Sequence, residues 1–174
     1  MIPQVRPAVR DDAEAIARIH VLSWQTAYRG QLPDHVLDDL SVERRRVMWQ
    51  ALLEQAASDE EHLGVVCLER VVGFAHVCHS RDNDAGPRTA EVSSIYLAPA
   101  AWGIGAGRML MSSMIEWLAG AGYTDSVLWV LDSNERARRF YEAAGWAADG
   151  AEKSETIAGV PVTEVRYRRD LPGS

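Results

Sequence analysis

The chain has 174 residues, of which 47% are hydrophobic and 25% charged, and its formal net charge is −7. These values predict a single soluble domain over residues 1–174 with its own hydrophobic core. The negative charge argues against a protein that binds nucleic-acid phosphates, and the sequence has no apolar run long enough for a membrane span. Cys67 and Cys78 lie in apolar runs, as free thiols do in a reducing compartment, so we expect a cytoplasmic protein without a signal peptide.

Hydrophobic periodicity and turn residues predict alternating strands and helices along the chain. The Asp11-x-x-Glu14 spacing resembles a capping box, which places a helix start there and its end near Ala27. We expect a strand at 3–8 before that first helix, and a second helix from Asp34 or Ser41 to Ala57 after it. Three strands follow, at 63–68, 71–78 and 89–97, and then a helix that ends at Gly120. The chain should continue with a strand at 127–131, a helix from 132 to Gly145, and two strands around 158–159. The strand–helix–strand unit from Thr89 to Leu131 should bring two parallel strands into a mixed sheet through a right-handed crossover.

The segment from Ala101 to Arg108 reads AWGIGAGR and has glycine at three alternate positions, after a strand-like run and before a helical one. A glycine-rich turn at a helix N-terminus points several main-chain N–H groups at one place, where the helix dipole adds positive charge, so it favours a bound phosphate. A dinucleotide fingerprint would need glycine in place of Arg108, and a P-loop would need Lys-Ser or Lys-Thr after Gly107. A tight turn that packs the helix close to the sheet, without any ligand, is the structural alternative.

Two motifs between Ala90 and Trp146 follow one another at a characteristic spacing. The run Trp102–Gly107 has the pattern x-x-x-Gly-x-Gly, and the run Asn134–Trp146 reads NERARRFYEAAGW. Together they resemble the Gln/Arg-x-x-Gly-x-Gly/Ala signature and the Asn…Phe-Tyr-Glu…Gly-Phe block of the GCN5-related N-acetyltransferase (GNAT) family, with Trp102 in place of the first Gln or Arg. The resemblance implies an α/β (α+β) fold with a mixed, mostly antiparallel twisted sheet, a central parallel strand pair that splays apart for coenzyme A, and helices on both faces.

The same resemblance implies that acetyl-CoA is the donor substrate. Its pyrophosphate would lie on the main-chain amides of Ile104–Arg108, and its pantetheine arm would pair with peptide groups of the strand at 89–97. The implied coenzyme-binding residues are Ile95, Tyr96, Leu97, Trp102, Gly103, Ile104, Gly105, Ala106, Gly107, Arg108, Asn134 and Phe140. Two of them have a second interpretation from the sequence: Asn134 as a helix N-cap, and Arg108 as a solvated arginine in the first helical turn.

The proton transfers of such a reaction need an acid and a base near the reacting groups. Tyr141 matches the family's tyrosine, which is thought to protonate the departing sulfur, although its spacing also suits a core residue. Some family members carry a glutamate on the fifth strand, and here that position is Trp129. We therefore predict that Glu91 is the base, directly or through water, with Asp132 as the second choice. An ordinary strand-end acid and a helix cap are the alternatives for these two residues.

The acceptor should bind between the first two helices and the late strands. Trp24 and Tyr28, four residues apart on one helix, could line this pocket or form a core pair, and the loop at 28–33 is where we expect acceptor selectivity. His20 and Trp49 are expected to be packing residues. The group His76, Cys78 and His79 lacks a fourth ligand at a recognisable spacing, so we predict no metal.

The sequence thus predicts an N-acetyltransferase that moves the acetyl group directly from acetyl-CoA to a primary amine of a small molecule, since neither motif contains a covalent acyl carrier. Two other functions stay open. One is acetylation of a protein N-terminus or lysine, and the other is a regulator that binds acetyl-CoA without turnover. Nucleic acid and membrane partners are not expected, and a homodimer is possible.

Overall fold

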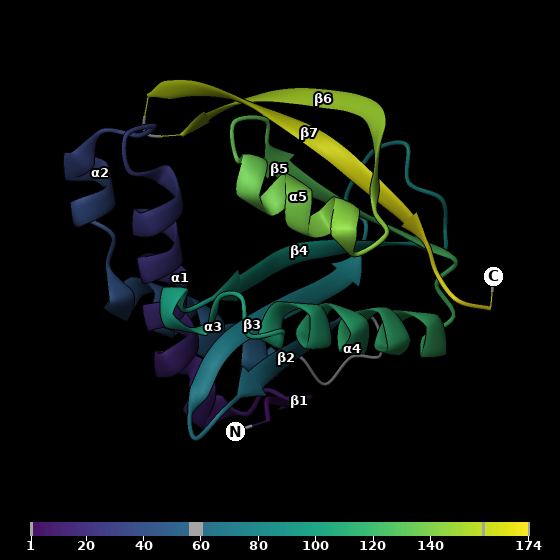
Figure 1. The fold of residues 1–174 in the computed structure, drawn as a ribbon, viewed down its shortest axis with the longest axis horizontal. Coiled ribbons are helices and arrows are strands. Elements are labelled where there is room, and N and C mark those ends of the chain that lie inside the picture. The colour runs from purple at the N-terminus through teal and green to yellow at the C-terminus, as the bar shows by residue number, and fades with distance from the viewer. Residues whose placement is uncertain (1, 56–60, 158, 174) are drawn as a thin grey trace.

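The computed structural model describes residues 2–55, 61–157 and 159–173. Its strands form one seven-stranded sheet in the order β1-β2-β3-β4-β5-β7-β6 (Figure 1). The strands are β1 (Gln4–Pro7), β2 (His62–Cys67), β3 (Val71–His79), β4 (Thr89–Leu97), β5 (Asp125–Leu131), β6 (Ala147–Ile157) and β7 (Val160–Asp170).

The helices are α1 (Ala13–Tyr28), α2 (Asp34–Asp38), α3 (Val42–Gln55), α4 (Ala106–Gly120) and α5 (Glu135–Ala143), with short 3₁₀ turns at Arg10–Asp12 and Pro99–Ala101. The predicted order of elements is confirmed along the described chain. The predicted second helix is two helices, because Asp39–Ser41 interrupt it, and its predicted end at 56–57 lies outside the described residues.

The predicted helix cap at Asp11 is wrong by one residue. The carboxylate of Asp12 accepts a hydrogen bond from Val9 N–H at 2.8 Å and pairs with the Arg6 guanidinium at 2.6 Å. This ion pair holds the pKa of Asp12 below its usual range, because the charged form is the hydrogen-bonded one. The start of α1 is therefore held through Asp12, which bonds to the preceding turn at Val9 N–H and to Arg6 of β1.

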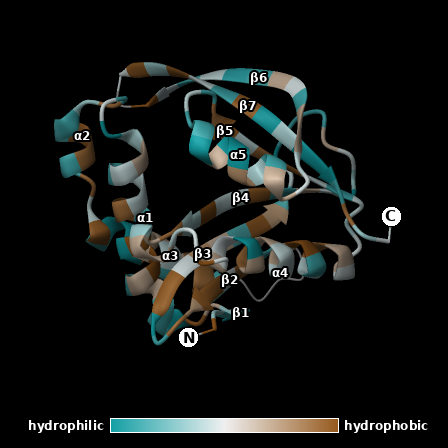
Figure 2. Ribbon diagram, in the orientation of Figure 1, coloured by the Kyte–Doolittle hydropathy of each residue, from teal (hydrophilic) through white to brown (hydrophobic). Residues whose placement is uncertain are grey.

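Helices cover both faces of the sheet, as predicted. The buried side of α4 packs on one face of β1, β2, β3 and β4, and α1 and α3 pack on the other face against β2 and β3. The buried side chains of α4 recur at helical spacing and are Ala106, Leu110, Met111, Met114, Ile115 and Leu118. In Figure 2 hydrophobic residues gather on the central strands, whereas much of the edge strand β6 is hydrophilic.

All neighbouring strands are antiparallel except β4 and β5. This parallel pair is joined by α4, as the strand–helix–strand unit predicts. The pairing is short, because Thr89–Glu91 face Asp125–Val127 and the register stops there. Beyond Glu91 the two strands diverge (Figure 1), and the space between them is the centre of the site described next.

Candidate active site

The second half of β4 presents main-chain groups to the space between β4 and β5. Ala98 N–H donates to Val72 C=O at 2.8 Å, so in this antiparallel ladder the peptide groups of Tyr96 face β3. Those of Ile95 and Leu97 face away from β3. Leu97 C=O accepts hydrogen bonds from Ser23 Oγ at 3.2 Å and from Trp102 Nε1 at 3.0 Å. Of the three residues predicted to offer peptide groups, Tyr96 thus contributes its side chain instead.

The glycine-rich turn leads directly into α4. Gly103 and Gly105 have φ values of 77° and 85°, which residues with a Cβ rarely adopt, and Gly105 is the N-cap residue of α4. The first amides of an α-helix have no acceptor within the helix, so those of Ala106, Gly107 and Arg108 are available to a ligand. A Cβ at Gly107 would stand 3.3 Å from both Leu97 Cδ1 and Phe140 Cε2. Bare backbone is therefore needed here for its conformation and for close packing.

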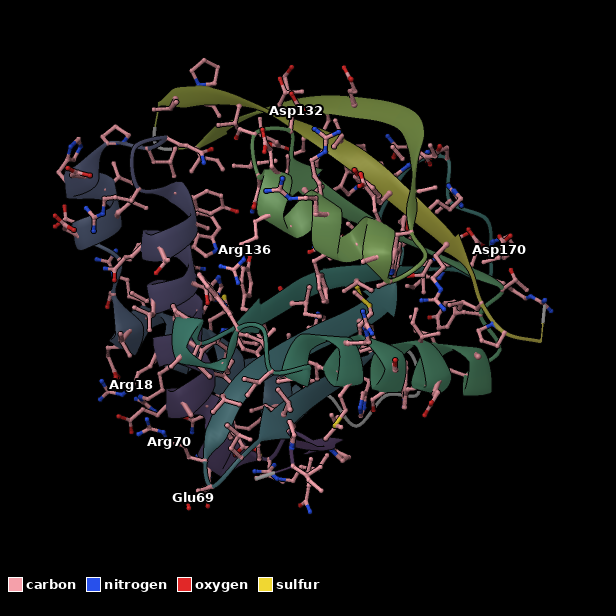
Figure 3. All side chains as sticks on the ribbon, in the orientation of Figure 1. Arg18, Glu69, Arg70, Asp132, Arg136 and Asp170 are labelled. Atoms are coloured by element: carbon pink, nitrogen blue, oxygen red, sulfur yellow. The ribbon has the colours of Figure 1, made fainter. Side chains whose placement is uncertain are left out.

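Trp102 occupies a position between this turn and α5. The Arg136 guanidinium stacks 3.1 Å from the centroid of the Trp102 ring, while the indole N–H bonds to Leu97 C=O. In Figure 3 Arg136 extends from α5 toward the connection between β4 and α4. Desolvation lowers the pKa of Arg136, although a guanidinium stays charged at neutral pH. The stack places a cation beside the glycine turn.

One cavity of about 1080 Å³ runs from the glycine turn through the gap between β4 and β5 to α1, β6 and β7. It brings together most residues predicted for the site: Trp24, Tyr28, Glu91, Ile95, Tyr96, Leu97, Trp102, Gly103, Gly105, Gly107, Arg108, Asn134, Phe140 and Tyr141. Two predicted residues do not line it. Ile104 is half exposed and Ala106 is fully buried in the core, so either could contribute only main-chain groups.

Tyr141 lies in the centre of this arrangement. It is buried on α5, packs edge-on against Phe140, and lines the cavity. Burial raises the pKa of its phenol, so the hydroxyl keeps its proton at neutral pH. Asn134 caps the same helix, because its Oδ1 accepts from Ala137 N–H at 3.1 Å. The capping interpretation of Asn134 is therefore correct, and its amide nitrogen stays available to the cavity.

Glu91 is buried at the end of the paired part of β4, with 6% of its surface exposed. Both of its carboxylate oxygens accept from the Arg81 guanidinium, at 2.7 and 3.2 Å. Asp132, the second choice for a base, pairs with Arg138 and keeps 58% of its side chain exposed. Figure 3 shows Asp132 at the far side of α5 from Arg136. Glu91 thus lies in the cavity wall, and Asp132 lies outside it.

Aromatic and charged side chains from four elements form the other end of the cavity. The rings of Trp24 and Tyr28 meet edge-on at 4.9 Å, and Trp24 Nε1 donates to Tyr96 Oη at 3.1 Å. Across from them Lys153 of β6 pairs with Glu164 of β7 at 3.0 Å. These four elements are α1, β4, β6 and β7.

Sequence reasoning missed the network that holds this end in place. Arg166 of β7 is buried and bonds to three carboxylates, those of Asp82, Asp84 and Asp149, at 2.7–2.9 Å. Asp82 also accepts from the indole of Trp129 at 3.0 Å. The loop after β3 is thereby fastened to β5 and β7. The alternation of charged and apolar residues in β7 was visible in the sequence, but the partners of Arg166 were not.

A second missed group lies on β3 and β4. His76 Nδ1 is 2.6 Å from Ser93 Oγ, and His76 Nε2 is 3.1 Å from Glu61 Oε2. Ser93 lines the cavity. Strand alternation places His76 and Cys78 on one face of β3 and His79 on the other. Within residues 2–55, 61–157 and 159–173 no cluster of three or more His, Cys, Asp or Glu residues could hold a metal ion. His76 takes part in a hydrogen-bonded chain instead.

Comparison with known proteins agrees with this geometry. The sequence profile of the Acetyltransferase (GNAT) family matches residues 14–146. The chain is also 31% identical over 164 residues to YuaI, an uncharacterised N-acetyltransferase of Bacillus subtilis, which covers 92% of this chain and 89% of the relative. The chain belongs to the GNAT acetyltransferase family.

Solved structures show the same fold. PaiA N-acetyltransferase from Thermoplasma acidophilum, in complex with coenzyme A, superposes on this GNAT protein with a TM-score of 0.79 at 16% identity, over 98% of this chain and 100% of the other. YncA from Salmonella typhimurium, with its cofactor acetyl-CoA, gives a TM-score of 0.73 at 20% identity, over 99% and 95%. The family and the fold inferred from the two motifs are thus confirmed. Within the described residues of this GNAT protein, no helix meets the length and hydrophobicity needed to cross a membrane.

Proposed function

We propose that this GNAT protein transfers the acetyl group of acetyl-CoA directly to a primary amine of a small-molecule acceptor. The observation that carries the proposal is the continuous cavity, which joins a main-chain anion cradle at one end to an aromatic and charged pocket at the other. The two similar structures with coenzyme A or acetyl-CoA support the choice of donor. When bound, acetyl-CoA supplies an activated acetyl group with a thiolate as leaving group.

The residues present fit this donor. The amides that open α4 would bind the pyrophosphate, because they lack helical acceptors and lie at the positive end of the helix dipole. Arg108 lines the cavity and Arg136 stacks beside the turn, so both would add charge-assisted contacts to phosphate oxygens. The peptide groups of Ile95 and the N–H of Leu97 face away from β3 and would bond the amides of the pantetheine arm, because Leu97 C=O already accepts from Ser23 and Trp102.

The catalytic groups follow from protonation and position. Tyr141, protonated at neutral pH, would donate to the leaving sulfur. Glu91 would accept a proton from the attacking nitrogen, through a water molecule, since Arg81 already engages both of its oxygens. This direct transfer needs neither a covalent acyl carrier nor a metal.

The elements that border the acceptor end on several sides favour a small molecule. The loop after α1 and the loop before α5 meet over the cavity, where Ser133 Oγ donates to Gln31 Oε1, and the β6–β7 hairpin forms another wall. Carboxylates and cations both line this end, which suits an amino-acid-like amine with charges of both signs. An extended polypeptide would need an open groove.

We further propose that the enzyme is cytoplasmic and forms a homodimer. Light scattering of the purified protein would test the homodimer.

A thiol-release assay tests the proposal. Acetyl-CoA is incubated with a panel of primary amines and amino acids, and with peptides that offer a free N-terminus or a lysine. We expect thiol release with small amines and a mass increase of the amine by one acetyl group. Release with peptides alone would favour the protein acetyltransferase, and coenzyme binding without any release would favour the regulator.

A glycine pair provides a matched control for the donor end. Gly105→Val puts a β-branched residue at a φ of 85°, so we expect it to abolish measurable acetyl-CoA binding in calorimetry. Gly120 ends α4 without a positive φ, and a Cβ there would meet no atom within 4 Å beyond its own helical turn. Gly120→Ala should therefore bind like the unmodified protein. Equal binding by both variants would remove the turn from the donor site.

A further inference from the structure

The reaction proposed above leaves a proton in a buried place. At neutral pH an amine acceptor arrives as an ammonium ion. The new N–C bond forms while the C–S bond breaks, the nitrogen loses two protons, and the sulfur gains one. One proton per turnover must therefore reach the solvent. Tyr141 and Glu91 account for the proton that passes from nitrogen to sulfur, so the other proton, which must leave before the attack, needs a route of its own.

A chain of three side chains leads from the cavity toward the solvent. Ser93 lines the cavity on β4, His76 follows on β3, and Glu61 stands just before β2. The distances are 2.6 Å from Ser93 Oγ to His76 Nδ1 and 3.1 Å from His76 Nε2 to Glu61 Oε2. The exposed fraction of the side chain rises from 9% at His76 to 32% at Glu61. The outer end of the chain is thus in contact with water.

A β-bulge aims Ser93 at its partner. The register between β3 and β4 shifts at His76, so Ser93 is an extra residue on β4 between Val92 and Ser94. A bulge re-aims the side chain of the extra residue, and here it allows one serine to border the cavity and to reach the ring on the neighbouring strand.

The chemistry of Glu61 sets the direction of every hydrogen bond in the chain. An ionised carboxylate can only accept, so His76 Nε2 carries the ring proton and donates it to Glu61. Nδ1 is then a lone pair, which accepts from the Ser93 hydroxyl. The other acceptor near that hydroxyl, His76 C=O, is farther away at 3.3 Å. The Ser93 oxygen therefore presents its lone pairs, and not its hydrogen, to the rest of its surroundings.

Resting on the proposed function, we propose that Ser93, His76 and Glu61 form the proton exit of the enzyme. Ser93 Oγ receives a proton from the bound ammonium, directly or through water, as its own proton passes to His76 Nδ1 and the Nε2 proton passes to Glu61. Glu61 releases that proton to solvent. Once the product has left, the Nδ1 proton passes back through the rotated Ser93 hydroxyl to water in the open cavity, while Glu61 delivers one solvent proton to Nε2, so one proton per turnover reaches the solvent in total. Ser93 is the member of the chain that faces the acceptor across the cavity, whereas His76 and Glu61 act through Ser93.

The surroundings of His76 keep the ring neutral and ready to receive a proton. Desolvation lowers its pKa, the nearby Arg81 lowers it further, and the carboxylates of Glu61 and Glu91 oppose this shift. The charged groups that face the ring come from the residue before β2, the loop after β3 and β4, and they are Glu61, Arg81 and Glu91. His62, the first residue of β2, is influenced by the charge of His76, but its own ring stacks on Trp117 of α4. From α3 the His76 ring meets the ring of Trp49, at 6.3 Å.

The pH dependence of turnover tests the proposal. Without the exit, the enzyme depends on acceptor molecules that arrive already neutral. We expect His76→Gln and Ser93→Ala to lower kcat/KM at pH 7 by about 10²-fold, the size of a general acid–base contribution, and to recover as the pH approaches the ordinary pKa of an amine, about 10. A loss that is constant from pH 6 to 9.5 would show a merely structural role and would overturn the proposal.

Two further variants and an NMR measurement distinguish a proton relay from a structural role of these residues. Glu61→Gln changes the half-exposed end and should show the same recovery, with a loss of about tenfold at pH 7. His62→Gln is the matched control, because this half-buried histidine stacks on Trp117 at 4.9 Å, outside the chain, and its profile should match that of the unmodified enzyme. Nitrogen NMR of the unmodified protein should find the His76 proton on Nε2. A proton on Nδ1 would overturn the proposal even if acetyl transfer is confirmed, whereas an unmodified enzyme that acetylates no amine would refute the proposed function itself.

Discussion

The two ends of the cavity are built in different ways. At the donor end, two continuous segments provide nearly all the residues that line the cavity. The first runs from the end of β4 through the glycine turn to the start of α4, and the second is the first two turns of α5. Much of that end is main chain, namely the helix amides and the peptide groups of β4 that face away from β3. At the acceptor end the walls are side chains from elements that are far apart in the chain, namely α1, the loop after β3, the middle of β4, β5, β6 and β7.

This difference teaches which substitutions each end can tolerate. A main-chain site depends on backbone conformation, so glycines and helix starts decide it, and most neighbouring side chains are free to vary. A side-chain site depends on the contacts that hold distant elements together. Substitutions at the donor end should therefore act on acetyl-CoA, and substitutions at the acceptor end should act on the amine.

Tyr141 lies where the two ends meet, so its replacement should have the largest effect on turnover. Tyr141→Phe removes one hydroxyl from a buried ring and keeps the packing against Phe140. We expect kcat to fall about 10²- to 10⁴-fold, the usual range for a lost general acid, with unchanged acetyl-CoA affinity by calorimetry. Unchanged turnover would remove the acid role, and a loss of folding would assign Tyr141 to the core.

Arg166 tests the side-chain end through stability. Its side chain is 8% exposed and faces three carboxylates, so Arg166→Met removes the ion-pair partner of Asp82 and Asp84 and leaves Asp149 with Arg168 alone. We expect a loss of about 3 kcal/mol in the free energy of unfolding by denaturant titration, and a higher KM for the amine with little change in acetyl-CoA affinity. Arg166→Lys is the comparison, because it keeps the charge but not the fork of donors. A variant that binds the amine normally would separate this network from the acceptor pocket.

The same contrast explains what could be predicted from the sequence. The donor end is encoded locally: the glycines at alternate positions and the cap at Asn134 are readable in one short window each, and α4 and α5 follow their hydrophobic periodicity. Even there, the direction of the Tyr96 peptide groups was not predictable, because it depends on the register with β3.

The acceptor end and the proton chain depend on pairings between distant residues. Arg166 and Asp82 are 84 residues apart, and His76 and Ser93 are joined across two strands by a bulge that shifts the register. The N-terminus of α1 shows the same limit of sequence-based prediction on a smaller scale. The hydrogen bonds of Asp12 to Arg6 and Val9 determine where this helix begins, and they could not be read from the sequence. Periodicity predicts which face of a strand is buried, but it does not predict which partner a buried polar group finds.

His20 gives the acceptor side a pH-dependent stability. The pKa of His20 is lowered from 6.5 to about 4, mainly because the ring is buried and to a lesser degree because of the positive charge of Arg45. Between these pH values the unfolded chain binds a proton that the folded protein does not, so stability is complete above pH 6.5 and falls as the pH drops toward 4, by about 3 kcal/mol in all.

Denaturant titrations from pH 7 to 4 would measure this loss. His76 has a lowered pKa too and adds to the slope in the same direction, so the comparison is between the unmodified protein and His20→Phe. The variant loses the acceptor of the Trp49 indole, at 3.1 Å, but its stability should depend less on pH. His35→Gln on α2, an exposed histidine, is the control that should keep the full slope. An unchanged slope in His20→Phe would refute the assignment.

Substitutions at Asn134 should have the smallest effect on the enzyme. They can separate helix capping from acetyl-CoA binding, because the two functions use different atoms of one side chain. Its oxygen caps α5 at Ala137 N–H, and its amide nitrogen is the group left for acetyl-CoA. Asn134→Ser keeps a capping oxygen and removes the nitrogen, whereas Asn134→Ala removes both. We expect the alanine variant alone to lose about 1 kcal/mol in the free energy of unfolding. Both variants should bind acetyl-CoA about tenfold more weakly, the equivalent of one hydrogen bond. If the serine variant binds acetyl-CoA as tightly as the unmodified protein, Asn134 is a helix cap and nothing more, and the donor end is then built from main chain to an even greater degree than proposed.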